Sequence, residues 1–145
     1  MDLKQFKTVE QLAAAIKTLD MVTSVAWTDY SGTSTIVGWA SYTTKVIEYK
    51  KIGKLVFVNF TIVGTSGGDD GTVATFTLPF THGHGAGNNP AFKPAKAKDN
   101  GGNLAGAGWG RVITATATFY TSESEAGWTA TGGKVIIGQF FYEIA

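Results

Sequence analysis

The sequence predicts an all-β protein: an antiparallel β-sandwich of jelly-roll type with one short N-terminal α-helix. Three observations support this class. Apolar and polar residues alternate along several short segments, turn-forming clusters of Gly, Ser, Asn and Asp separate these segments, and only the first twenty residues show a helical pattern. The strongest alternation runs from Leu55 to Gly64 and has one wholly apolar face (Val56, Val58, Phe60 and Ile62).

The helix is expected from about Val9 to Leu19. Thr8 and Gln11 have the spacing of a capping box, and apolar residues then recur at intervals of three and four (Val9, Leu12, Ile16 and Leu19). This stripe covers only two heptads, which is too short for an independent coiled coil. We expect residues 1–20 to form a segment that either docks on its own sheet or joins a threefold bundle that nucleates a trimer. Residues 21–145 then form one sandwich domain.

Seven or eight strands are expected in the remainder of the chain. Their ranges are Val22–Tyr30, Ile36–Trp39, Tyr42–Tyr49, Leu55–Gly64, Thr72–Leu78, Arg111–Thr121 and Lys134–Ile144, with one short edge strand within Phe92–Lys98. Lys50–Lys54 has the length of a hairpin loop, in which Gly53 is free to adopt positive φ. The segment from Thr81 to Gly110 contains eight glycines and two prolines. We expect it to be mainly a long loop, which is either functional or mobile.

Composition excludes several function classes. Only 16% of the 145 residues are charged, the net charge is +1, and Arg111 is the single arginine, so we expect no nucleic-acid partner. The absence of cysteine excludes disulfides and cysteine-based zinc sites. No apolar run approaches the roughly 18 residues of a membrane span, and the first twenty residues lack the continuous apolar core of a signal peptide. We therefore expect no membrane insertion and synthesis in the cytoplasm.

His82 and His84 are the one pair with metal-ligand spacing. In an extended segment both imidazoles would face the same side and could chelate one cation. Three such pairs could surround an ion on the axis of a trimer. The alternative is that two polar histidines decorate a glycine-rich loop, because no third ligand type lies nearby in the sequence.

Aromatic residues are the better candidates for ligand binding. Trp109 and Trp128 stand at expected loop–strand junctions, where a flat ring could stack on a sugar while Asn88 and Asn103 bond its hydroxyl groups. The alternative is that both tryptophans pack the ends of the core. No cofactor is expected.

Catalytic patterns are not found in the sequence. There is no cysteine, both histidines lie in one loop, and the glycines around Gly106 lack the Lys-Ser/Thr of a phosphate-binding loop. Asp69 and Asp70 suit a turn, and we expect Glu123 and Glu125 to be solvated loop residues. The sequence therefore favours a protein that is not an enzyme.

A family resemblance rests on two stretches of the chain. Tyr49, Gly53, Leu55 and the strand through Gly64–Ser66 lead to a glycine-rich turn and then to Phe76–Phe80. This order, together with the final strand from Lys134 to Tyr142, resembles the β-sandwich receptor-binding domains of tailed-bacteriophage tail fibres and head fibres. The resemblance covers about a third of the chain. It departs at the N-terminus, where a short helix stands in place of a long fibre shaft.

The resemblance implies a homotrimeric structural protein of the virion. Its exposed end would attach to a polysaccharide or protein of the bacterial surface, and its other partners would be further virion proteins. Two alternatives remain open at this point. One is a capsid- or tail-decoration and assembly protein without a host ligand, with the helix as its docking element. The other is a small carbohydrate-binding domain.

Overall fold

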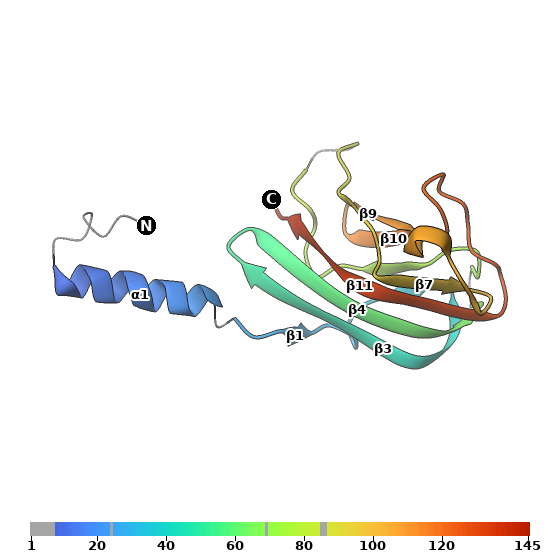
Figure 1. Cartoon of the computed structure of the whole chain (residues 1–145), viewed down its shortest axis with the longest axis horizontal. Coiled ribbons are helices and arrows are strands. Elements are labelled where there is room, and N and C mark those ends of the chain that lie inside the picture. Colours follow the sequence, from blue (N-terminus) through green and yellow to red (C-terminus); the bar gives the residue numbers. More distant parts are fainter. Residues whose placement is uncertain (1–7, 24, 69, 85–86) are drawn as a thin grey trace.

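The computed structural model describes residues 8–23, 25–68, 70–84 and 87–145. Two antiparallel sheets pack face to face as a sandwich, and one helix extends from one end of it (Figure 1). The all-β fold class with a short N-terminal helix is therefore confirmed. Among the described residues, no helix is both long and apolar enough to cross a membrane.

The larger sheet has six strands in the order β1-β3-β4-β11-β7-β8. Their bounds are β1 Thr28–Asp29, β3 Trp39–Ile52, β4 Leu55–Ser66, β7 Lys96–Asp99, β8 Gly102–Asn103 and β11 Gly133–Glu143. The smaller sheet has five strands in the order β2-β5-β10-β9-β6. Their bounds are β2 Ile36–Val37, β5 Thr75–Thr77, β6 Ala91–Phe92, β9 Trp109–Ile113 and β10 Thr116–Tyr120, and a 3₁₀ turn, η2, covers Ala105–Ala107.

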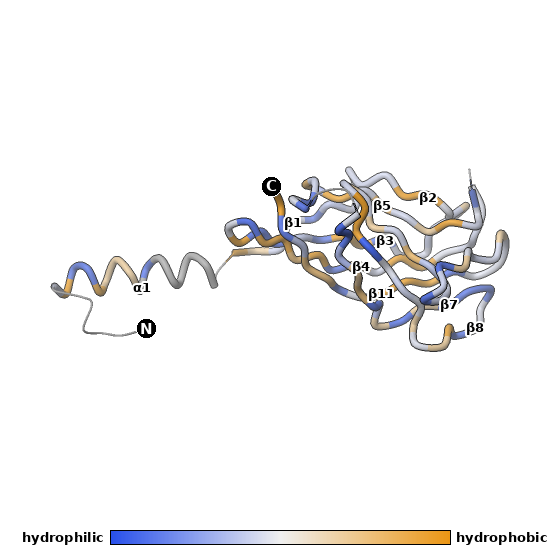
Figure 2. The backbone as a smooth tube through the Cα atoms, turned by 90° about the horizontal axis from the view of Figure 1, so that it is seen from above, coloured by the Kyte–Doolittle hydropathy of each residue, from blue (hydrophilic) through white to orange (hydrophobic). Residues whose placement is uncertain are grey.

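The helix α1 covers Val9–Thr23, four residues beyond its expected end. Thr8 caps it as predicted, because its hydroxyl accepts a hydrogen bond from the backbone N–H of Gln11 at 3.2 Å. Figures 1 and 2 both show α1 extending away from the sandwich and covering neither sheet. The docking of this helix on its own sheet is therefore not observed. The strand expected from Val22 to Tyr30 is reduced to β1, because Val22 and Thr23 belong to the helix and residues 25–27 and Tyr30 are not in a strand.

The hairpin of β3 and β4 has a shorter turn than expected. Pairing continues to Ile52 opposite Leu55, so Gly53 and Lys54 alone form the turn, in place of the loop expected over Lys50–Lys54. Gly53 has φ of 59°, the left-handed conformation that a two-residue turn requires. The predicted alternation of β4 is confirmed, since its apolar face is buried.

The single strand expected from Arg111 to Thr121 was a wrong prediction. The chain forms a hairpin there: β9 ends at Ile113, β10 begins at Thr116, and the two residues pair with each other. Val112 and Ala117 are both buried, although they would lie on opposite faces of one continuous strand. The two-residue turn at Thr114 and Ala115 reverses the chain and changes which residues face the core, and the regular alternation of the sequence concealed it.

The segment from Thr81 to Gly110 contains more regular structure than expected. The predicted edge strand within Phe92–Lys98 is divided at Pro94, because β6 joins the smaller sheet and β7 joins the larger one. A proline cannot donate to a strand ladder, so it marks the point where the chain changes sheets. β8 then pairs with β7 and forms the edge of the larger sheet.

One continuous core fills the space between the two sheets. Phe60 of β4 lies at its centre, with ring centroids 5.2 Å from Phe119 and 5.6 Å from Phe76. Phe92 and Phe140 stack at 4.1 Å and join β6 to β11. These contacts unite strands that are far apart in the sequence, and none of the α1 side chains that the structure describes belongs to the buried core.

Candidate functional site

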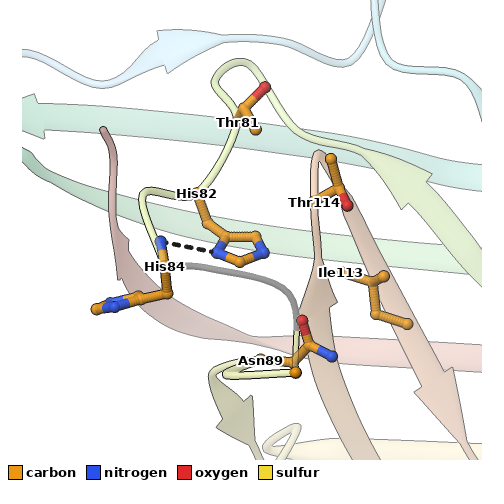
Figure 3. Close-up of a pocket in the computed structure, with 7 residues that line it drawn as sticks. Thr81, His82, His84, Asn89, Ile113 and Thr114 are labelled. Carbon is orange, nitrogen blue, oxygen red and sulfur yellow. Dashed lines mark hydrogen bonds between the residues drawn. The ribbon is translucent and has the colours of Figure 1, made fainter.

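A polar cavity of about 330 Å³ opens at one end of the sandwich (Figure 3). Its described lining residues are Thr81, His82, His84, Gly87, Asn89, Ile113 and Thr114. His82 is 7% exposed and forms an isolated bridge with Ile144, so the cavity lies beside the C-terminal end of β11. Figure 1 shows that this is the end from which α1 extends. We call this the histidine pocket.

The two histidines do not form a chelating pair in the single chain. The Nδ1 atom of His82 accepts a hydrogen bond from the backbone N–H of His84 at 3.2 Å, which occupies its lone pair. The ring centroids are 6.2 Å apart, and Figure 3 shows the His84 side chain pointing away from the His82 ring. No group of three or more His, Cys, Asp or Glu side chains that could hold a metal ion is found in the part of the chain that the structure describes. A metal site on the axis of a trimer stays a prediction.

The structure separates the four residues considered for ligand binding. Asn88 is exposed beside the histidine pocket, at the Ile113 end of β9, whereas Trp109 begins β9 at its other end. Asn103 lies on β8, at the edge of the opposite sheet. These side chains therefore do not form one site.

Trp128 is a core residue. It is 4% exposed, and its indole N–H donates to the backbone carbonyl of Phe119 at 2.8 Å. The ammonium group of Lys134 lies 5.2 Å from its ring centroid. A ring enclosed in this way offers no face to a ligand at the surface.

Lys134 is a buried cation that sequence reasoning missed. Its side chain is fully buried, and its three ammonium protons are donated to the backbone carbonyls of Gly38 and Gly71 at 2.9 Å and of Val73 at 2.8 Å. Burial lowers the pKa of Lys134 to about 8, against the smaller opposing effect of Asp99 and Asp70. Because every donor is used internally, this lysine stabilises the fold and is not placed to act as a nucleophile.

The alternation of the final strand could have indicated that Lys134 is buried. Lys134 shares the inward face of β11 with Ile136, Phe140 and Tyr142, which are all buried. Trp39 encloses the ammonium from the other side, at 5.0 Å from its ring centroid. A lysine on the apolar face of a predicted strand therefore indicated a buried group that needs carbonyl partners.

A cluster of polar and aromatic side chains lies on the outer face of the smaller sheet. Trp109 of β9 pairs directly opposite Tyr120 of β10, with ring centroids 5.6 Å apart and planes inclined by 35°. The guanidinium carbon of Arg111 lies 5.8 Å from the Trp109 ring centroid and 5.4 Å from that of Tyr120. Its Nη1 atom donates to Oε1 of Glu125 at 2.8 Å. We call these four residues (Trp109, Arg111, Tyr120 and Glu125) the aromatic shelf.

The loop after β10 is held to this face by two ion pairs. Besides the Arg111–Glu125 pair, Lys93 contacts Glu123 at 2.5 Å. The hydrogen bond from Lys93 lowers the pKa of Glu123 below its ordinary value. Both acids are exposed loop residues as expected, but each also forms an ion pair. The sequence did not indicate these pairs, because each base is far from its acid along the chain. With each acid neutralised by its own base, the arrangement suits ligand binding better than proton transfer.

The acidic turn before β5 behaves as its sequence predicts where it is described. Asp70 accepts hydrogen bonds from the backbone N–H of Thr72 at 3.0 Å and from its hydroxyl at 2.6 Å, which lower the pKa of Asp70. Asp69 lies outside the described residues. The turn therefore uses its carboxylate for local structure.

Comparison with known proteins adds no relative: no family model matches the chain, and no curated protein or solved structure shows significant similarity to it.

Proposed function

We propose that this chain is a trimeric head module of a tailed-bacteriophage virion, a structural, non-enzymatic protein that recognises the bacterial surface. The observation that carries the proposal is the position of α1. The helix leaves the sandwich without covering either sheet, which gives the chain the shape of a short stalk and a head (Figures 1 and 2). Attachment of the stalk to further virion proteins leaves the head free to meet a polysaccharide or protein of the host.

The helix needs partners outside its own sandwich. A helix of 15 residues is marginally stable alone in water. Val9, which begins its apolar stripe, is 81% exposed. Packing of three such stripes around one axis would bury them and place three heads side by side.

The outer face of the larger sheet carries two apolar pairs that could take part in self-association. Val63 of β4 pairs with Val135 of β11, and Phe57 pairs with Phe141, whose ring centroid lies 6.0 Å away. Phe141 is among the most exposed large apolar residues of the head. Exposed apolar side chains are common at protein interfaces, so contact between neighbouring heads would cover Phe57 and Phe141.

The head would bind with modest affinity at each site, and several heads on one particle would multiply it by avidity. The aromatic shelf lies at the Trp109 end of the β9–β10 hairpin, remote from the histidine pocket and from α1. A stalk attached at the α1 end would therefore present the shelf toward the outside.

The first test is the solution mass of the full chain, by light scattering on a size-exclusion column. We expect the mass of three chains. A monomer across the accessible concentration range would overturn the trimeric head and make a small carbohydrate-binding domain the better model.

Deletion of residues 1–20 tests the roles of stalk and head separately. We expect the deleted chain to be lost from virions, while the purified head still adsorbs to host cells. A different result would favour the decoration or assembly protein without a host ligand. In that case the deleted chain is lost from virions, and neither the full chain nor the purified head adsorbs to host cells.

A further inference from the structure

The rings of the aromatic shelf are fixed before any ligand arrives. Trp109 and Tyr120 occupy directly paired positions on adjacent strands, and Arg111 contacts both rings. Rigid aromatic side chains lose little conformational freedom on binding, so their contact area contributes efficiently to affinity. A half-exposed indole held this way is suited to the apolar C–H face of a pyranose ring.

The ion pair beside the rings presents a donor and an acceptor together. Arg111 uses Nη1 to bond Oε1 of Glu125, which leaves further guanidinium protons and the second carboxylate oxygen beside the rings. The two groups are partly exposed, at 28% for Arg111 and 38% for Glu125. Neighbouring hydroxyl groups of a sugar both donate and accept, and therefore complement such a pair.

The charge balance of the shelf selects against an acidic ligand. Glu125 already neutralises Arg111, and Glu123 neutralises Lys93 at the near edge. An anionic sugar would have to displace a carboxylate from its base and would meet two acidic side chains as it approached.

From this geometry we infer that the aromatic shelf is a binding site for an uncharged pyranoside with two neighbouring hydroxyl groups. The inference rests on the proposed role in host recognition and names the class of ligand. Trp109 stacks on the sugar, Tyr120 and Arg111 hold the indole in place, and the Arg111–Glu125 pair bonds the hydroxyls.

The test uses the full chain and a nuclear magnetic resonance titration. Arg111 is the only arginine, so its Nε–H signal is unique and needs no further assignment. The probes are methyl β-glucopyranoside, methyl α-mannopyranoside and methyl β-galactopyranoside, with methyl β-glucuronide as the charged counterpart of the glucoside. We expect at least one neutral glycoside to shift the Arg111 signal saturably in the millimolar range, and the glucuronide to bind more weakly than the glucoside.

Two substitutions in the shelf and one matched control sharpen the test. Trp109→Ala should weaken binding by about tenfold. Glu125→Gln leaves Arg111 without its counter-charge and should raise the affinity for the glucuronide by about fivefold while weakening that for the neutral glycoside. Trp27→Ala is the control. Trp27 is also exposed (43%), and the ammonium group of Lys50 lies 5.4 Å from its ring centroid. It precedes β1, the edge strand of the larger sheet, and is therefore not part of the aromatic shelf. It should leave binding unchanged.

Each contrary outcome has a defined meaning. The inference is overturned if no neutral glycoside shifts the Arg111 signal, if the glucuronide binds the unaltered chain more tightly than the glucoside, or if Trp109→Ala binds as well as the unaltered chain. Light scattering on the same samples separates this from the proposed function. A trimer that adsorbs to cells but binds no glycoside retains the proposed function with a protein receptor, whereas a monomer that binds the glycoside retains only the site.

Discussion

Lys134 occupies a position in β11 whose neighbours of the same parity are apolar or glycine. Its ammonium group connects three carbonyls of the chain segments around Gly38 and Gly71–Val73, and two indole rings enclose it. A buried charge is tolerated only where hydrogen bonds replace its hydration, and here the backbone supplies all of them. One side chain of the larger sheet thereby fixes the connections that lead into the smaller sheet.

Substitution of Lys134→Met should lower the free energy of unfolding by about 2–4 kcal/mol. The apolar side chain fills most of the volume but removes a charged donor from the carbonyls of Gly38, Gly71 and Val73. Chemical denaturation measures the change. Lys96→Met, on an exposed position of β7, is the control and should change stability by less than about 0.5 kcal/mol. An equal effect of the two substitutions would show that the carbonyl contacts contribute little.

The same residue predicts a pH dependence of stability. Its pKa is about 8 in the folded chain and 10.5 when unfolded, so both states are protonated below pH 8 and the folded state carries the full cost of the buried charge. Between these values the folded state releases the proton first, and unfolding takes a proton up. The free energy of unfolding contributed by this group should therefore rise as pH increases from about 8 toward 10. Denaturation of the unaltered chain and of Lys134→Met across this range measures the difference, which should be flat if the pKa is not lowered.

At the scale of elements, the β9–β10 hairpin shows how a turn can be hidden in an alternating sequence. Thr114 adopts φ of 53°, a left-handed conformation that a β-branched residue rarely takes. Contacts from outside the hairpin hold it there: the carbonyl of Thr114 accepts from the N–H of His82 at 2.9 Å, and that of Ala115 from Leu78 at 2.7 Å. Tertiary hydrogen bonds therefore impose a turn that local propensity disfavours.

Thr114→Gly should raise the free energy of unfolding by about 1 kcal/mol, because glycine adopts this φ without steric strain and both carbonyl contacts remain. Thermal or chemical unfolding measures the gain. Thr116→Gly, within β10, should have the opposite sign, since glycine weakens a strand. A loss of stability in Thr114→Gly would show that its side chain contributes more than the strain that it imposes.

The whole molecule combines a core between the two sheets with exposed apolar residues on α1 (Val9) and on the outer face of the larger sheet (Phe141). The core residues come from both sheets, and no described side chain of α1 is among them, so the two sheets pack without contribution from that part of the helix. α1 covers neither sheet (Figures 1 and 2), and Val9 on the helix and Phe141 on the outer face of the larger sheet are both exposed. Burial of both would be the driving force for the proposed trimer.

Val63→Lys should convert the proposed trimer toward monomers without unfolding the head. Val63 lies on the outer face of β4 beside Val135, where a charge would be costly to bury in an interface. Light scattering measures the mass and circular dichroism the fold. Thr118→Lys, on the outer face of the smaller sheet, is the control and should keep the mass of three chains. If Val63→Lys also kept the mass of three chains, the trimer interface would not include the outer face of the larger sheet at Val63.

The sequence by itself determined the fold class, the cap at Thr8, the buried face of β4 and the final strand, because these depend on residues close together in the chain. Tertiary structure decided the rest. It placed Trp128 in the core, divided the segment around Pro94 between two sheets, and brought Arg111 to Glu125 beside Trp109 and Tyr120. A period-2 pattern states which side chains share a face, whereas strand order and register decide which of those faces meet.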